Sequence, residues 1–276
     1  MQIALLGCSA KHPSAPTVAA PALKAINLTL AQGEQVAIIG PSGAGKTTLL
    51  HVMACALKPT RGKLLLDGRN LWALRTADLQ RLRGQLCLAP QVPPLPPRQR
   101  VITAVLAGLL PGMGLWESLA NLLYPRHIDL AEAALARFDL ADKLFDRVDR
   151  LSGGERQRVG LARLAVANAR LLLVDEPLSA LDPERARQAC ASLTAVAREQ
   201  QATLVATLHH VDMALQHFPR IVGLRDGEVV FDLPTTEVTP ERLTDLYARH
   251  LDELTGKAAA FDHPMASVPA VAVTCR

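Results

Sequence analysis

A glycine-rich loop between an apolar run and a helical pattern constrains this chain more than any other feature. Residues 36–39 are apolar throughout and predict a short buried strand. The loop GPSGAGKT follows at residues 40–47, and residues 48–54 predict the first turns of a helix. Glycines allow consecutive backbone N–H groups to curl around an anion, and the new helix adds its unpaired N-terminal donors. Strand, loop and helix together predict a phosphate-binding site.

The residues of this loop divide into three predicted roles. The Lys46 ammonium is expected to contact the β- and γ-phosphates of a nucleotide, and the Thr47 hydroxyl is expected to bind Mg²⁺. The other predicted nucleotide contacts come from the loop and the first helical turn: Gly40, Pro41, Ser42, Gly43, Ala44, Gly45 and Thr48.

Composition narrows the class of protein. A chain of 276 residues suits one large domain, or one domain with a small appendage. Its net charge of +4 is mildly basic and lacks the dense Lys/Arg loading of a dedicated nucleic-acid binder. Aromatic residues make up 3% and none precedes Trp72, which argues against a stacking surface for single strands. We therefore expect no nucleic-acid partner.

Cysteine spacing and hydropathy bear on the compartment. The 5 cysteines include no C-x-x-C pair, so neither structural zinc nor a disulfide framework is expected and a reducing cytoplasm fits. Residues 1–7 have no basic region and are too short a stretch for a signal peptide. The longest apolar stretch, residues 101–110, is about half a membrane span. We expect a protein that does not cross a membrane but could dock on one.

Alternating strands and helices predict an α/β fold with a mainly parallel, right-handed wound sheet. Residues 26–30 alternate apolar and polar side chains, and with residues 2–6 they predict an antiparallel N-terminal β subdomain. Further strands are predicted at residues 63–67, 86–89 (buried), 171–174, 203–207 and, as a hairpin across Asp226-Gly227, at 221–224 and 229–231.

The predicted helices include an all-helical insertion. It spans residues 101–150, within a helical subdomain of about residues 92–165, with helices at 101–110, 116–124, 128–138 and 141–145. Other helices are predicted at residues 77–83, 155–167, from Pro183 with Asp182 as N-cap, at 211–217 and at 241–254. We expect one domain over residues 1–256 and a loose, disordered tail over 257–276.

Residues 92–98 contain four prolines in five positions, which excludes a helix or a central strand. The segment reads either as a plain rigid loop or as an exposed contact surface. Local sequence leaves both readings open.

Two carboxylates follow the apolar run at 171–174. Asp175, at the end of the strand, can reach a metal held by Thr47. Glu176, the next residue, can polarise a water at the γ-phosphate. The pair alone is a weak signal, because Asp-Glu also marks ordinary strand-to-turn junctions.

A second anion-binding pattern lies at Ser152, Gly153 and Gly154, where a hydroxyl and two small residues begin a helix. Serine is also a good N-cap, so a simple capped helix explains the same residues. One chain could not easily place two phosphate sites on opposite faces of one nucleotide. A two-fold dimer could do so, each serine site covering the nucleotide of the other chain.

Along residues 1 to 250 the chain resembles the ATP-binding cassette (ABC) ATPases. Residues 40–47 match the Walker A loop, Gln91 the Q-loop, 151–157 (LSGGERQ) the signature, 171–176 Walker B, 179–182 the D-loop and His209 the switch histidine. The resemblance implies a P-loop NTPase that binds ATP and Mg²⁺. It further implies that Gln91 senses Mg²⁺ and the lytic water, that His209 contacts the γ-phosphate, and that Ser152 and Gly154 act across a dimer.

The chain departs from the family pattern at two places. The family usually stacks an aromatic ring on adenine from the first strand–loop region, which here contains no Phe, Trp or Tyr. His12 is the nearest substitute, although it could equally be a solvated loop residue. Pro90 stands where an aromatic residue often precedes the Q-loop glutamine.

A subgroup signal lies in TLHHVDMAL at residues 207–215 and RIVGLRDG at 220–227, with Leu115-Trp116 and Leu246-Tyr247 in support. These resemble the ATPases of phosphonate or phosphite importers. The resemblance implies two copies on the cytoplasmic face of the inner membrane, membrane permease subunits and, indirectly, an extracytoplasmic solute-binding protein. Another cargo (amino acid, metal or lipoprotein) or a soluble ABC ATPase acting on nucleic acid remains as an alternative.

Overall fold

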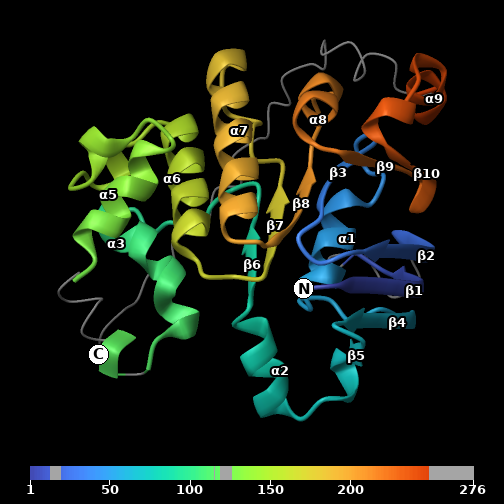
Figure 1. Ribbon diagram of the computed structural model, residues 1–276, viewed down its shortest axis with the longest axis horizontal. Coiled ribbons are helices and arrows are strands. Elements are labelled where there is room, and N and C mark those ends of the chain that lie inside the picture. The colour runs from blue at the N-terminus through green and yellow to red at the C-terminus, as the bar shows by residue number, and fades with distance from the viewer. Residues whose placement is uncertain (13–19, 115, 119–125, 249–276) are drawn as a thin grey trace, which may run out of the picture.

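The computed structural model describes residues 1–12, 20–114, 116–118 and 126–248 (Figure 1). Its centre is a 6-stranded sheet in the order β10-β9-β3-β8-β7-β6. Neighbours in this sheet pair in parallel, except that β10 returns antiparallel beside β9. The predicted α/β class with a mainly parallel sheet is therefore confirmed. The strands are β3 (Gln35–Ile39), β6 (Leu86–Ala89), β7 (Leu171–Asp175), β8 (Thr203–Thr207), β9 (Arg220–Arg225) and β10 (Glu228–Pro234).

A second sheet of 4 strands has the order β2-β1-β4-β5, and all its pairs are antiparallel. The strands are β1 (Ile3–Ala10), β2 (Leu23–Leu30), β4 (Arg61–Leu66) and β5 (Arg69–Asn70). It is the predicted N-terminal β subdomain, and α1 (Lys46–Met53) shares its core.

The central sheet has a hydrophobic core on each face. In β3, Val36 and Ile38 belong to the core formed with α1 and the second sheet, whereas Ala37 and Ile39 belong to the core formed with the other helices. Successive strand side chains point to opposite faces, so both must be apolar when both faces are covered. This explains why the central strands read as uninterrupted apolar runs.

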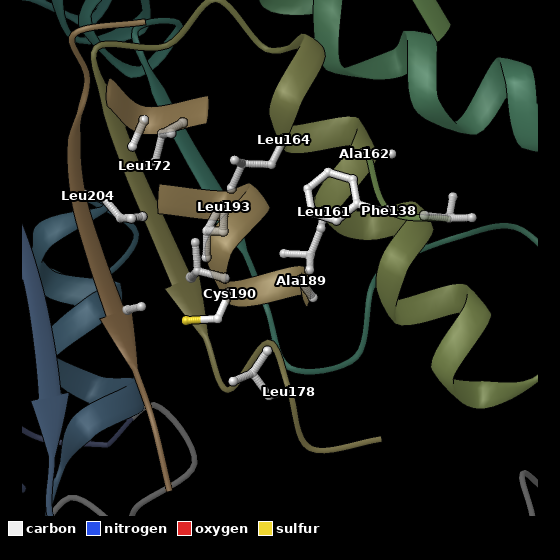
Figure 2. Close-up of a cluster of buried hydrophobic side chains, with 14 of the residues drawn as sticks. Phe138, Leu161, Ala162, Leu164, Leu172, Leu178, Ala189, Cys190, Leu193 and Leu204 are labelled. Carbon is white, nitrogen blue, oxygen red and sulfur yellow. The ribbon is translucent and has the colours of Figure 1, made fainter. Parts of the chain in front are cut away.

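Most of the remaining helices cover the other face of the sheet or extend beyond it. Figure 2 shows side chains of α6, α7, β7 and β8 meeting there, with Phe138 among them. The helices are α2 (Thr76–Arg83), α3 (Val101–Leu106), α5 (Ile128–Ala136), α6 (Gly153–Val166), α7 (Pro183–Glu199), α8 (Val211–His217) and α9 (Pro240–Leu246). Short 3₁₀ turns lie at Leu71–Ala73, Ala107–Gly112, Ala141–Lys143, Val148–Arg150 and Thr235–Glu237.

The structure corrects several predicted elements. Strand β6 is half-buried rather than buried, because it is the edge strand and only β7 pairs with it. The helix predicted at 141–145 is a single 3₁₀ turn. The helix predicted at 101–110 is α-helical only as far as Leu106, and a 3₁₀ segment containing Pro111 follows it. Helix α9 ends at Leu246, before the predicted residue 254.

Some predictions fall outside the described residues: most of the helix at 116–124, the loop after His12 and the tail at 257–276. Among the helices that are described, none is long and apolar enough to span a membrane.

Candidate functional site: a nucleotide-binding loop and its acidic neighbours

The predicted phosphate loop connects β3 to α1, and two of its glycines cannot be replaced without a clash. A Cβ on Gly40 would lie 1.9 Å from the Leu224 carbonyl oxygen, and a Cβ on Gly45 would lie 2.6 Å from that of Ala22. Both glycines also have positive φ, 152° and 104°. Larger residues would push the loop away from β9 and from the segment before β2, so glycine is needed at these two positions.

The start of α1 is suited to an anion. Gly45 is its N-cap, and within the described chain no side chain caps this helix and no acidic residue lies in its first turn. Helix N-termini carry unpaired N–H groups and a partial positive charge. Ser42 and Gly43 are exposed, Gly45 and Thr47 are half-buried, and Pro41, Ala44 and Thr48 are buried.

Lys46 is buried at the start of α1, and its Nζ donates to the carbonyl oxygens of Gly40 (2.7 Å) and Pro41 (3.2 Å). A lysine ammonium donates hydrogen bonds and accepts none, so phosphate oxygens are suitable acceptors for the same Nζ. The Lys46 side chain thus contacts the phosphate-binding loop to which it belongs.

The two predicted acidic residues at the end of β7 both bond to Thr207, at the end of β8, Asp175 through its carboxylate and Glu176 through its backbone N–H. Asp175 and Thr207 are register partners in the parallel ladder. The Thr207 hydroxyl donates to Asp175 Oδ1 (2.6 Å) and accepts from the Glu176 N–H (3.0 Å). Glu176 itself has a positive φ of 47°, a costly conformation for glutamate that such contacts can maintain.

Two predicted catalytic residues, from two other segments, converge on the Glu176 carboxylate. His209 Nε2 lies 2.6 Å from Oε1, and Gln91 Nε2 donates to Oε2 over 2.7 Å. The Glu176 side chain is only 13% exposed. Burial alone would raise the pKa of Glu176, but the hydrogen bond and charge of His209, together with the charge of Lys46, lower it. Glu176 is therefore ionised at neutral pH, as a general base must be.

The second predicted anion site is a capped helix start in the described chain. Ser152 Oγ accepts from the Glu155 N–H (3.2 Å), and Glu155 Oε2 accepts from the Ser152 N–H (2.7 Å). This capping box satisfies two donors at the start of α6. Ser152 and Gly153 are nevertheless exposed, so this end of α6 presents its surface to solvent.

Gln157, to which the sequence patterns assign no role, connects α6 to the segment that follows β7. Its Nε2 donates to the Glu176 carbonyl (2.9 Å) and to Ser179 Oγ (3.1 Å), and its Oε1 accepts from the Ala180 N–H (3.0 Å). A Cβ on Gly154 would lie 2.8 Å from the Ala180 carbonyl oxygen, so the same segments are also in close contact there. Displacing the start of α6 would therefore displace Glu176.

The remaining predicted residue, His12, lies just after β1 and is exposed. The residues that follow it are outside the described ranges, so its predicted role at adenine stays a prediction.

Thr207→Val is expected to lower the ATP hydrolysis rate at least tenfold, a loss typical of misplaced catalytic groups. Valine keeps the β-branched shape but neither donates to Asp175 nor accepts from Glu176. Thr207→Ser keeps the hydroxyl and should stay near the parent rate. The measurement is phosphate release at saturating ATP, and equal rates for the two variants would contradict the role of the hydroxyl.

A phosphate loop with a buried lysine, beside a strand-end aspartate and a glutamate held by glutamine and histidine, defines a P-loop nucleotide-binding protein. The ABC transporter family model matches residues 23–179. The chain belongs to the ABC transporter family and is one of its ATP-binding cassettes.

Named relatives match over most or all of the chain. The phosphonates import ATP-binding protein PhnC of Polaromonas sp. is 66% identical over 277 residues, covering 100% of both chains. PhnC 1 of Pseudomonas syringae pv. syringae is 55% identical over 227 residues, covering 82% of this chain and 86% of the relative.

A solved structure with similar architecture is the dimeric structure of MJ0796, a bacterial ABC transporter cassette. It has a TM-score of 0.72 and 28% identity, and the match covers 84% of this chain and 98% of that one. A dimeric post-hydrolysis state of MJ0796 bound to ADP and Pi matches with a TM-score of 0.71 and 27% identity.

Proposed function

We propose that this chain is the ATPase subunit of an ABC importer and that Glu176 is the general base of hydrolysis. One observation carries the assignment: Gln91 and His209 hold both carboxylate oxygens of an ionised Glu176. Release of one oxygen from its partner would let Glu176 accept a proton from the water that attacks the γ-phosphate. Lys46 and the amides at the start of α1 bind the phosphates. The proposed ATPase domain comprises residues 1–256 and includes a helical subdomain at about residues 92–165.

The residues proposed to hold Mg²⁺ are Thr47, Gln91 and Asp175. Their hydroxyl, amide and carboxylate oxygens are the hard ligands that Mg²⁺ prefers. The described residues contain no group of three or more His, Cys, Asp or Glu side chains that could hold a metal. Mg²⁺ is usually bound by one or two carboxylates together with water and substrate phosphates, and Asp175 is the carboxylate of the proposed set. When bound, the ion neutralises charge on the β- and γ-phosphates.

The proposed active unit is a two-fold dimer of this chain. Ser152, Gly153 and Gly154 at the start of α6 would contact the γ-phosphate of the nucleotide bound to the other copy. The exposure of Ser152 and Gly153 and the dimeric MJ0796 structures support this proposal.

The proposed membrane partner is a separate permease, so the chain would be peripheral on the cytoplasmic face of the inner membrane. The proposed docking face is the proline-rich loop after Gln91 together with the helical insertion. Val92 and Trp116 there are 80% and 83% exposed, which is unusual for large apolar side chains and typical of contact surfaces. Pro93 packs closely against Gly160 of α6, where an added Cβ would lie 2.7 Å from Pro93 Cγ. Because of this contact, a displacement of the loop would also displace α6.

The proposed cargo is a phosphonate or phosphite, delivered by an extracytoplasmic solute-binding protein. The proposal is supported by relatives named as phosphonates import proteins, one of which is 66% identical over the whole chain. The ATPase does not contact the solute, so this inference rests on relatives and not on site chemistry. The alternative is an ABC importer of the same type that transports a different solute.

Cells that lack this chain are expected to fail to grow with a phosphonate or phosphite as sole phosphorus source, yet to grow on phosphate. A plasmid copy should restore growth, and a copy with Val92→Asp should not, although its isolated ATPase rate stays near that of the parent. Aspartate would place a charge in the proposed apolar contact. Normal growth of the deletion strain on every reduced phosphorus compound would contradict the cargo, and full rescue by Val92→Asp would contradict the docking face.

A further inference from the structure

A tyrosine near the end of the described chain contacts the phosphate loop from outside. The Tyr247 hydroxyl accepts a hydrogen bond from the Gly40 N–H over 3.1 Å, between residues separated by 207 positions. Tyr247 is only 1% exposed, and Gly40 is buried as well. Gly40 lies one residue beyond β3, and its N–H bonds to this side chain instead of to a neighbouring strand. A buried N–H that loses its partner is costly, so the contact constrains the orientation of the peptide.

The two polar groups of Gly40 are held by different parts of the protein. Its N–H bonds to Tyr247, whereas its carbonyl oxygen accepts from Lys46 Nζ. Lys46 is also the proposed phosphate ligand, so nucleotide oxygens compete with the Gly40 carbonyl for the same ammonium donors. The Tyr247 contact uses the N–H of Gly40 and the Lys46 contact uses its carbonyl, so loss of the Lys46 bond on nucleotide binding does not by itself break the bond to Tyr247.

Segments after residue 220 also contact the loop at Gly40 and Ala44. The Leu224 carbonyl fills the space beside Gly40, and the Gly227 N–H, in the β9–β10 turn, donates to the Ala44 carbonyl over 3.0 Å. Helix α9 is itself fixed, because the Arg225 guanidinium binds the Asp245 carbonyl oxygen and Leu246 is fully buried. Figure 1 shows α9 beside β9 and β10, in the same part of the molecule as β3.

We infer that Tyr247 is a positioning residue for nucleotide binding. Its hydroxyl fixes the first peptide of the phosphate loop, so that the loop is already curved when the phosphates arrive. The inference rests on the proposed ATPase function, and it adds a role for the C-terminal helix in setting nucleotide affinity. Without the hydroxyl, the Gly40 peptide could rotate toward another partner, and nucleotide binding would have to reverse that rotation.

Tyr247→Phe tests the inference, since phenylalanine keeps the ring and its packing and removes only the hydroxyl group. We expect the KM for ATP and the Kd for ADP to rise roughly 3- to 10-fold, as for one net hydrogen bond. The kcat should stay within about twofold, because Glu176 and its partners lie on other elements. Amide hydrogen exchange should become faster in the peptide covering residues 39–46 without faster exchange across the whole chain.

Thr244→Val is the matched control. It also removes one hydroxyl from α9, where Thr244 Oγ1 donates to the Pro240 carbonyl, but Thr244 is exposed and is one turn away from Tyr247. It should leave KM and loop exchange unchanged. Parent values of KM and Kd in Tyr247→Phe would overturn the inference, even if thermal stability fell. A parent protein that binds no nucleotide would instead contradict the proposed function, and loop exchange would still report whether Tyr247 orders the loop.

Discussion

Replacing Glu176 with glutamine should lower the ATP hydrolysis rate about 10²–10⁴-fold, the usual contribution of a general base. Glutamine has nearly the same shape and can hold a water, but it cannot take up the proton. The lowered pKa of Glu176 means that the substitution also removes a full negative charge beside the predicted γ-phosphate position. Lys46, Thr47 and Asp175 remain, so ATP binding should persist or become tighter.

The matched control is Glu199→Gln. Glu199 is an exposed glutamate on α7 that pairs with Arg137 over 2.7 Å, outside the site. Phosphate release and nucleotide binding should both be measured for the two variants. A parent hydrolysis rate in Glu176→Gln would show that another group removes the proton from water.

Ser152→Arg should lower the ATPase rate roughly 10²-fold or more, comparable to losing a group that stabilises transition-state charge. Ser152 begins α6 and is exposed. In a two-fold dimer its side chain and the first amides of α6 would face the nucleotide held by the other copy. A long arginine would occupy that space and keep the two copies apart.

Ser152→Ala separates this effect from simple loss of the cap. Alanine removes the acceptor for the Glu155 N–H and should cost about 1 kcal/mol of stability. It adds no bulk, so association with ATP should survive. Equal ATPase losses in the alanine and arginine variants would show that Ser152 matters as a cap and not as part of an interface.

Sequence patterns were sufficient for the local parts of the site. The apolar run before Gly40 and the helix after Lys46 are near neighbours in the chain, and their periodicities predicted both elements. Strand β7 and the N-cap at Asp182 followed in the same way, and the structure has both. Each depends on contacts within a few residues, which is the range over which side-chain patterns act.

Contacts between segments that are distant in the sequence could not be predicted from such local patterns. Thr207 looks like an ordinary strand residue, and only the pairing of β7 with β8 places it against Asp175. In the sequence Tyr247 belongs only to a subgroup pattern, because its partner Gly40 lies at the other end of the chain. The same limit explains β6, whose apolar sequence predicted burial although its place at the sheet edge leaves it half-buried.

Two copies of this chain are proposed to enclose ATP, and the molar mass of Glu176→Gln, measured by light scattering, tests this arrangement. Without nucleotide the mass should be near the 29.6 kDa of one chain, and with ATP it should double. Tight binding of ligand by the dimer alone shifts association in this way. Adding Ser152→Arg should keep the mass at one chain even with ATP. A Glu176→Gln protein that binds ATP yet stays at 29.6 kDa, or a double variant that still doubles its mass, would contradict this arrangement.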